Sequence, residues 1–557
     1  MGGSPTRRPD PAEVWPGRRH GFERTAASSA LLAAVRRDPR RVVTCVSAVV
    51  NGRRVRWSTR SLSVPCAEVD GGSLRFEGKL LGDGELTSRM NPSDRSSDLP
   101  QFSVEADNLQ ALGIEDEPEA GAFVEPLAGG TVEVAVAHLD VDWSHRLVAL
   151  HGNLSSARYG PDGESVQFSA STRWRGLERA VVPTVDAIAW PSVVADNVGK
   201  PYPLAVGYVY DSRALKVEPI GGSRNYFLVN GAPLGSTLLS ARSSSGATLV
   251  TTGSIVRRTD GAGRAVEIHD VTSADAEIFV EVSTSANGFL RHASSDSGSI
   301  GTLIAWLLVR ATALRGEDVD VAGAMEYALM YLHRYGFGVD SEGTARDLLE
   351  NRVVPQTFGY TSFRGGRYGF RRFPLDGPRA TPAAAAHLAF GRELLSGGTL
   401  SEGDDSELVN QFSASWRHSA LSGEFTNDRA RAPSAFDSGT SFWSRVSAAM
   451  NREAGAKAVE FPDLWDWRDV RSVLRADERL LGLVLRDAEY LATAEALRVS
   501  AGDVVEVTDD RLGFARKPFL VLALGITMRP VVRLQLMEWP RREDVLAVYG
   551  SAGLGAL

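Results

Sequence analysis

The sequence predicts a multidomain protein that is mainly β and carries smaller α+β portions. Its 557 residues are enough for several hydrophobic cores, because one domain takes about 150 residues. Apolar residues make up 43% of the chain and charged residues 23%, which is the composition of an ordinary globular protein. Short segments of alternating polarity, separated by Gly, Asp and Asn turns, recur along most of the chain, whereas helical periodicity is concentrated in one block.

Charge and cysteine content exclude several classes of protein. The net charge of −8 does not favour general binding to nucleic acid. Cys45 and Cys66 are the only cysteines, so neither a disulfide scaffold nor a cysteine-rich metal site is expected. We interpret them as two buried thiols, with one disulfide between them as the alternative. The apolar run Leu303–Val309 is shorter than the roughly 20 residues of a membrane-spanning helix, and no signal peptide or membrane anchor is expected.

The N-terminal region reads as a leader followed by a β module. Residues 1–41 form the leader, in which Ser28–Arg37 has the apolar spacing of a short helix. Val42–Val50, the turn Asn51-Gly52 and Arg53–Thr59 form a strong hairpin pattern. Further strands are expected at Leu74–Leu80, Gln101–Ala106, Thr131–Ala137, Leu147–Leu154 and Val166–Ser171. Their spacing is typical of a barrel or sandwich, and the polar loop Met90–Pro100 is expected to lie exposed.

A connector separates this module from a second β region. It is punctuated by Pro183, Pro191, Pro201 and Pro203. The second region runs from about Leu204 to Val282. Its clearest hairpin joins Ser254–Thr259 to Arg264–Val271 through Asp260-Gly261. Ile278–Val282 is expected to be a strand that leads into the helical block.

The block from Ser297 to Phe373 has the clearest helical periodicity. One face of a first helix carries Ile300, Leu303, Ile304, Leu307, Leu308, Ala311 and Leu314. Gly316 follows where a left-handed C-cap is expected. Asp320 is expected to cap a second helix that ends at Gly336. The inner face of this second helix would consist of Met325, Ala328, Leu329 and Leu332.

The same block ends in a third helix and a hairpin. Thr344 and Asp347 have the spacing of a capping box, and Pro355 prevents the third helix from continuing. The hairpin pattern consists of Phe358, Tyr360, the turn Gly365-Gly366, Tyr368 and Phe370. Three short helices bury too little by themselves. We therefore expect them to lie against a sheet whose other strands come from elsewhere in the chain.

The C-terminal third mixes expected helices and strands. Helices are expected at the alanine-rich Pro382–Leu395 and at Ser441–Met450. Strands are expected at Leu408–Arg417, Gly502–Thr508, Phe519–Leu524 and Pro530–Glu538. The link Phe461–Trp467 is aromatic and expected to be irregular, and residues 539–557 form a tail.

No motif for catalysis, cofactor binding or metal binding stands out. Gly199-Lys200 is followed by Pro201 and does not complete a Walker A motif; GxGxxG, HExxH and GxSxG do not occur. One histidine-rich segment contains His138, Asp140, Asp142, His145 and His151. It could hold a metal only if a strand-turn-strand structure brought these side chains together. Exposed hairpin positions are the preferred interpretation. The paired carboxylates Asp404-Asp405, and Asp318 with Asp320, suit turn and cap roles better than acid catalysis.

A basic and aromatic stretch at the expected hairpin is more informative. It contains Arg364, Arg367, Arg371 and Arg372. Guanidinium–phosphate pairing and stacking would suit contact with nucleic acid, and several copies facing a common channel would line it. These four arginines are therefore candidate channel-lining or DNA-facing residues. The alternative is a hairpin tip with solvated arginines.

Four features, in this order, resemble the hub or tail-tip proteins of tailed phages and gene transfer agents. The first two are the early hairpin with Val55-Arg56-Trp57-Ser58-Thr59 and the connector from Gly199 to Gly207. The third is the helical block with Val319-Asp320 and Tyr335-Gly336-Phe337. The fourth is a structural motif of Gly502, Asp503, Val504 and Val505, followed by Leu512-Gly513. The resemblance spans most of residues 42–538.

The resemblance implies a specific architecture. Such hubs carry two tail-tube-like β-barrels in one chain, and three chains form a ring that can match a hexameric tube. Here the first barrel would be residues 42–180, an inserted β domain 181–275, and the second barrel with its helices 276–538. Ring closure would bury barrel edges against neighbours.

The implied function is that of a structural virion protein without enzymatic activity or cofactors. The ring, a baseplate hub at the tail tip, would join the tail tube to tip or fibres around an axial channel, which DNA crosses without specific binding. Implied partners are two further copies, a tail tube or distal tail protein, tip or fibre proteins and the tape-measure protein. The chain would be made in the host cytoplasm and end in the virion.

Two alternatives belong to other classes of protein. The first is a receptor- or glycan-binding tail adhesin, in which Trp416, Trp443, Trp465 and Trp467 stack on sugars, although buried core tryptophans are the preferred interpretation. The second is a cell-wall hydrolase, for which the sequence offers no constellation of catalytic residues.

Overall fold

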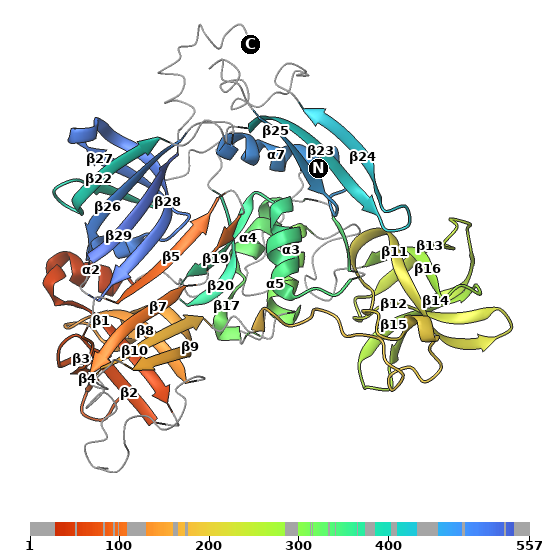
Figure 1. Cartoon of the computed structure of the whole chain (residues 1–557), viewed down its shortest axis with the longest axis horizontal. Helices are drawn as coiled ribbons and strands as arrows, with labels where there is room; N and C mark the ends of the chain where they lie inside the picture. Colours follow the sequence, from red (N-terminus) through yellow and green to blue (C-terminus); the bar gives the residue numbers. More distant parts are fainter. Residues whose placement is uncertain are drawn as a thin grey trace, which may run out of the picture.

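Most of the chain folds into β-sheets. The computed structural model describes residues 28–539, apart from 51–52, 82–83, 93–94, 99, 108–129, 160–164, 173–175, 285–298, 312–313, 315, 332, 334, 340, 365, 374–384, 403–408, 432–454, 482–484 and 529–530. The described part forms sheets of 16, 7, 3 and 3 strands with a few helices, which confirms the prediction of a mainly β protein with α+β portions. The helices α3 (Ile300–Trp306), α4 (Ala322–Met330) and α5 (Ala345–Asp347) lie between the 16-stranded and the seven-stranded sheet (Figure 1). No helix among these residues is long and apolar enough to cross a membrane.

The N-terminal strands follow the predicted order. Helix α2 (Ser29–Arg37) has Ser28 as its N-cap and buries Leu31 and Val35. Strands β1 (Val42–Val50) and β2 (Arg53–Ser58) form the predicted hairpin. The other predicted strands are β4 (Ser73–Gly78), β7 (Gln101–Asp107), β8 (Thr131–His138), β9 (Leu147–Tyr159) and β10 (Ser165–Thr172).

Part of this region differs from the prediction. Strands β3 (Leu62–Pro65), β5 (Glu85–Asn91) and β6 (Ser96–Ser97) are not among the predicted ones. The expectation that Met90–Pro100 lies exposed is wrong, because Met90, Arg95 and Ser97 are buried. The polar composition misleads here because the Arg95 guanidinium donates to buried backbone carbonyls.

The C-terminal strands join the N-terminal ones in a single sheet. They are β21 (Ala386–Ala389), β22 (Leu394–Glu402), β26 (Arg486–Thr493), β27 (Val504–Asp509), β28 (Phe514–Thr527) and β29 (Val531–Glu538). The main path runs β22-β26-β29-β28-β5-β7-β10-β9-β8-β1-β2-β4-β3. The antiparallel pair β5–β28 makes the junction, from Ala523↔Arg89 to Thr527↔Glu85. One hydrophobic cluster accordingly contains side chains of both parts, such as Val134 and Leu534.

The C-terminal third confirms the predicted strands and corrects a predicted helix. The expected helix Pro382–Leu395 is wrong, because its described part forms β21 and the start of β22. Strand β21 pairs in parallel with β27, and this sheet pairing outweighs local helix propensity. The predicted strand Leu408–Arg417 is β23 (Val409–Ser419), which lies between β24 (Glu424–Arg431) and β25 (Gly455–Phe461).

The prediction misses a helix that begins at the end of the link Phe461–Trp467. Trp467 begins the amphipathic helix α7 (Trp467–Leu481). This helix buries Val470, Val473 and Leu474 in the same hydrophobic cluster as Phe412 of β23. The predicted helix Ser441–Met450 and Trp443 lie outside the described residues, as do Asp404-Asp405, residues 1–27 and residues 540–557.

The middle of the chain forms the seven-stranded sheet. Its strands are β11 (Leu204–Gly221), β12 (Arg224–Asn230), β13 (Ser236–Arg242), β14 (Val250–Thr259), β15 (Ala265–Thr272), β16 (Glu277–Thr284) and β18 (Gly336–Val339). The order is β13-β16-β11-β12-β15-β14, with β18 paired to β11. The predicted hairpin at Asp260-Gly261 is confirmed as the β14–β15 connection. Strand β16 lies between β13 and β11.

The first two predicted helices form with different ends. Helix α3 buries Ile300, Leu303 and Ile304 and continues as a π-helical turn, Leu307–Ala311. The predicted C-cap at Gly316 is wrong, because this glycine begins the 3-10 turn Gly316–Asp318.

The second helix is shorter than predicted. The Asp320 carboxylate accepts a hydrogen bond from the Ala322 amide at 3.0 Å, as expected of a cap. The predicted inner-face residue Leu329 is exposed, and Leu332 lies outside the described residues. Helix α4 ends at Met330, and Gly336 starts β18 instead of stopping the helix. A Cβ at Gly336 would lie 1.8 Å from the Tyr208 carbonyl oxygen, so glycine permits β18 to approach β11.

The third helix and the hairpin match the prediction. Thr344 Oγ1 accepts from the Asp347 amide at 3.1 Å and donates to its carboxylate at 2.8 Å, which confirms the cap. Helix α5 continues through a π-helical turn and a 3-10 turn, Val354–Gln356, that contains Pro355. Strands β19 (Gly359–Arg364) and β20 (Arg367–Arg372) form the hairpin.

One sheet beside these helices is local, and its described strands are β17 (Val319–Asp320), β20 and β19. The helices also share their hydrophobic cluster with Leu215 and Leu228 of the seven-stranded sheet, whose strands other than β18 come from elsewhere in the chain, as expected. Cys45 and Cys66 are both free and buried, as interpreted from the sequence.

Candidate functional site

The arginine hairpin and the Gly502 motif, two separate candidates in the sequence, lie together in the structure. Arg364 Nη2 of β19 is 3.9 Å from an Asp503 carboxylate oxygen. That carboxylate also accepts from the Ser500 amide at 2.8 Å, which fixes the turn before β27. Val504 and Val505 continue into β27 as buried core residues.

Glycine is required at position 502 because Tyr360 of the hairpin occupies the adjacent space. Gly502 has a φ of +85°, and a Cβ there would lie 1.6 Å from the Tyr360 hydroxyl oxygen. Tyr360 itself packs in a cluster with Phe373, Val504 and Trp539. The hairpin therefore braces the C-terminal strands through one face, while α4 packs against Phe370 on the other.

The hairpin arginines are half-buried rather than fully solvated. Burial, together with the neighbouring charge of Arg371, lowers the pKa of Arg364. The Nε–H groups of Arg364 and Arg371 are buried and have no hydrogen-bond acceptor within the described structure. Arg372 Nε donates to Glu326 of α4 at 3.2 Å. The tip glycine Gly366 lies against β9, since a Cβ there would be 2.9 Å from that of His151.

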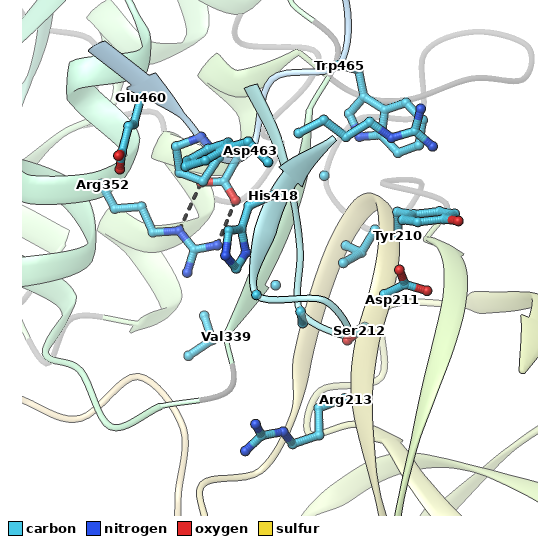
Figure 2. A pocket seen from close by; sticks show the side chains of 18 residues that line it. Tyr210, Asp211, Ser212, Arg213, Val339, Arg352, His418, Glu460, Asp463 and Trp465 are labelled. Carbon is cyan, nitrogen blue, oxygen red and sulfur yellow. Dashed lines mark hydrogen bonds and ion pairs between the residues drawn. The ribbon is translucent and has the colours of Figure 1, made fainter. Parts of the chain in front are cut away.

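A pocket lies elsewhere, where β11, β18 and the β23–β25 sheet meet (Figure 2). Its volume is about 490 Å³. Strand β11 contributes Tyr210, Asp211 and Arg213, and Arg417, Asp463 and Trp465 lie on or after the strands of the smaller sheet.

Two acidic groups of this pocket, Asp463 and Asp211, already have partners. Arg352 binds Asp463 through two nitrogen–oxygen contacts, of 3.0 and 2.7 Å. Gln356 donates to the same carboxylate at 2.7 Å. Asp211 accepts from the Ser419 hydroxyl at 2.8 Å.

The guanidinium group of one arginine in the pocket packs against two aromatic rings. The Arg417 guanidinium carbon lies 4.7 Å from the ring centre of Tyr210 and 4.1 Å from that of Trp465. Its Nε–H is buried and has no acceptor among the residues that the structure describes. Arg417 and Asp211 also have positive φ angles of 59° and 55°, which are uncommon for residues other than glycine and often mark functional sites. A guanidinium presented in this way suits an anionic group such as a carboxylate or phosphate.

Of these pocket residues, sequence reasoning considered a binding role only for Trp465. A positive φ at Asp211 or Arg417 leaves no pattern in a sequence, because it depends on contacts between distant strands. Of the other tryptophans, Trp416 is buried in the core beside Trp467, with ring centres 5.3 Å apart. This arrangement agrees with core packing for Trp416.

The histidine-rich segment is divided between separate roles. His138 is buried, contrary to the preferred interpretation of exposed hairpin positions, and its Nε2 lies 3.0 Å from the Asp38 carbonyl oxygen. Asp142 caps the turn Trp143–His145, and His151 Nδ1 lies 3.2 Å from Asp318. No group of three or more His, Cys, Asp or Glu side chains that could hold a metal ion occurs among the described residues.

A second histidine network was not expected from the sequence. The Tyr327 hydroxyl lies 3.0 Å from His333 Nδ1, and His333 Nε2 lies 2.9 Å from the Ser472 hydroxyl. Ser472 donates to the Asp469 carbonyl at 2.8 Å, so the histidine Nε2–H donates to Ser472. Burial lowers the pKa of His333 to about 4. The network joins α7 to the helical block, and a lone histidine gives no signal of it in the sequence.

Comparisons with known proteins found similar solved structures but no related family or curated protein. No protein-family model and no curated protein matches the chain. The tail protein from Neisseria meningitidis MC58 is 9% identical with a TM-score of 0.40, covering 89% of this chain and 98% of that one. The 43 kDa tail protein of prophage MuSo2 from Shewanella oneidensis is 10% identical with a TM-score of 0.39, covering 90% and 99%.

A chain from the virion of a native gene transfer agent particle is 14% identical with a TM-score of 0.40, covering 64% of this chain and 88% of that one. These structural neighbours are two tail proteins and a chain of a gene transfer agent virion. Their TM-scores lie below 0.5, and the function proposed for this chain therefore depends on its own sheets and contacts.

Proposed function

We propose that this chain is a structural virion protein that forms a ring, the baseplate hub, at the distal end of a phage-type tail. Three copies would surround an axial channel for DNA and join the tail tube to tip or fibre proteins. The tape-measure protein would end at this ring. The proposed role is mechanical and includes neither catalysis nor specific binding of DNA.

The junction between β5 and β28 is the observation that carries the proposal. It joins the N-terminal and C-terminal strands edge to edge through five residue pairs, from Ala523↔Arg89 to Thr527↔Glu85. An ion pair of 3.3 Å between Arg533 and Glu85 lies across the junction. Two sets of strands from opposite ends of the chain thus already share one edge.

Repeating an edge junction of this kind between copies would close a ring. The main path of the sheet ends at β22 on one side and at the short strands β4 and β3 on the other. Unpaired strand edges tend to pair, and head-to-tail contacts form a ring when the rotation between copies closes. Three copies, each with two sets of strands, would present six sets of strands to a hexameric tube. In this proposal residues 42–180 and 276–538 form the two tube-like barrels, and 181–275 the inserted domain.

The arginine hairpin faces the channel in this proposal. Arg364 and Arg372 contact Asp503 and Glu326, so the charge available to a passing phosphate backbone would come mainly from Arg367 and Arg371. Such contacts would be independent of sequence, because phosphate carries no base information.

The experiment that tests the ring is a mass measurement of the purified full-length chain, combined with negative-stain microscopy. The expected result is a species of about three times 59.9 kDa that appears as a ring with a central hole. A virion that contains this chain as a single copy, or away from the tail tip, would contradict the proposal. A monomer that binds glycans would favour the adhesin instead.

A further inference from the structure

The described residues cover only part of the outer face of the first β region. Along β1, alternate residues point to opposite faces, and Val46 and Ala48 face the large core. On the other face, Val43 and Cys45 pack with Phe76 in the cluster beneath the β3–β4 hairpin. The next two residues on that face, Ser47 and Val49, belong to an open pocket instead.

This pocket has a volume of about 320 Å³ and a floor made of four paired strands, β2, β1, β8 and β9. One row across the floor consists of Arg56, Ser47, Glu133 and His151, each paired with the next. The neighbouring row consists of Arg54, Val49 and Thr131. Two arginines on one strand therefore point to the same side, two residues apart.

On the strands of the floor, Glu133 and His151 have partners, but Arg54 and Arg56 have none within the described part of the chain. Glu133 accepts from Arg146 at 2.6 and 3.0 Å, and His151 contacts Asp318. Arg54 and Arg56 form no ion pair or side-chain hydrogen bond with any residue that the structure describes. Arg56 is half-buried, and burial together with the charge of Arg54 lowers its pKa. An anion between the two side chains would relieve both effects.

Strand β2 also has an open edge beside these arginines. It pairs with β1 along Arg53–Trp57, but with β4 only at Trp57 and Ser58. Among the described strands, none pairs with the outer edge of β2 from Arg53 to Arg56. An open edge with unpaired backbone groups is a template for an added strand.

We propose that this edge and pocket bind an acidic, extended segment of another protein, which adds to β2 as a strand and places carboxylates against Arg54 and Arg56. Alternate side chains of an added strand point to one face, so acidic residues two positions apart match the spacing of the two arginines. Inorganic phosphate or nucleic acid would satisfy the guanidinium groups alone. Only a polypeptide satisfies the guanidinium groups and the open backbone edge together. The inference does not depend on the ring.

The test measures fluorescence anisotropy of labelled peptides with the full-length chain. One probe is Glu-Val-Glu-Val-Glu-Val; the second is the same peptide methylated on every backbone nitrogen, which has the same charge but no backbone N–H group. The first peptide is expected to bind about tenfold tighter or more, because a strand without N–H donors cannot complete a ladder with β2. Arg54→Glu with Arg56→Glu should weaken its binding by about tenfold or more. Arg75→Glu, an exposed β4 arginine outside the pocket lining, should change it by less than about twofold.

Each of several results would overturn the proposal. Equal binding of the two peptides would show a charged patch without strand addition. Tighter binding of a thymidine oligonucleotide, lost in the double variant, would show a nucleic-acid site. Release of the peptide by equimolar inorganic phosphate would show an adventitious ion only, and no peptide binding by the unaltered chain would remove the site. If the double Glu variant has an altered circular dichroism spectrum, Arg54→Gln with Arg56→Gln provides the same comparison without charge reversal.

Discussion

Arg95 and Asp477 form a buried ion pair between a loop of the N-terminal strands and helix α7, with side chains only 4% and 11% exposed. The same guanidinium donates to the backbone carbonyls of Pro355, at 2.8 Å, and Thr357. Arg95 adopts a φ of 53°, a conformation held by these contacts. One cation therefore ties together three segments that are distant in the sequence.

Removing the carboxylate of this pair should destabilise the protein strongly. Asp477→Ala leaves the Arg95 charge buried without its anion, and we expect a loss of about 3–5 kcal/mol in the free energy of unfolding. Urea denaturation measures this loss. The double variant Arg95→Met with Asp477→Leu should lose clearly less, because no uncompensated charge remains. A double variant as unstable as the single one would contradict this account of the pair.

Stability should fall in mild acid because of His333. Burial lowers its pKa from 6.5 to about 4 in the folded chain, so between these pH values the unfolded chain binds a proton that the folded chain does not. The contribution is fully present above pH 6.5 and is lost as the pH falls toward 4, by up to about 3 kcal/mol.

Urea denaturation at neutral pH and near pH 4.5 measures this dependence for the unaltered chain and for His333→Gln. Carboxylates titrate in both proteins, so the difference between their two slopes isolates the histidine. Identical slopes would mean that His333 is protonated equally in the folded and unfolded states.

Gly502→Ala should be far more costly than a glycine substitution with similar backbone geometry. The new methyl group would overlap the Tyr360 hydroxyl, and we expect a loss of more than about 3 kcal/mol. Gly513 provides the matched control, since its φ of +68° is also positive but a Cβ there meets nothing within 4 Å. Gly513→Ala should cost only about 1–2 kcal/mol of backbone strain. Thermal and urea unfolding of both variants decides the comparison.

Charge reversal in the arginine hairpin tests the proposed channel. Arg367→Glu with Arg371→Glu should leave ring assembly in place but lower DNA delivery by particles about tenfold or more, because the channel wall would repel phosphates. Arg258→Glu, on the seven-stranded sheet, is the matched control and should not affect delivery. Normal delivery by correctly assembled double-variant particles would remove these arginines from the channel.

Local turn and cap chemistry made much of this fold predictable. The β1–β2 hairpin and the β19–β20 hairpin lie where Asn-Gly and Gly-Gly turns interrupt alternating residues. The cap formed by Thr344 and Asp347 also depends only on neighbours in the sequence. Such features are decided within a few residues, and the sequence contains them directly.

Features decided by distant partners could not be predicted. The alanine-rich segment at Ala386–Ala389 is a strand because β27, far along the chain, supplies its hydrogen bonds. The polar segment around Arg95 is buried because Asp477 lies on a helix that was itself not predicted. The candidate site shows the same limit: Arg364 and Asp503 were singled out separately, and only the folded chain brings them together.

The β5–β28 pairing also constrains how the protein is made. Strand β5 emerges from the ribosome long before its partner residues Ala523–Thr527 are translated. Until then the backbone N–H and C=O groups along one edge of β5 have no partner strand. Nascent chains on the same messenger RNA could pair with each other through these edges. Pairing between such distant strands is slow. The yield of the protein would then be limited by its dependence on chaperones during synthesis and not by the stability of the folded chain.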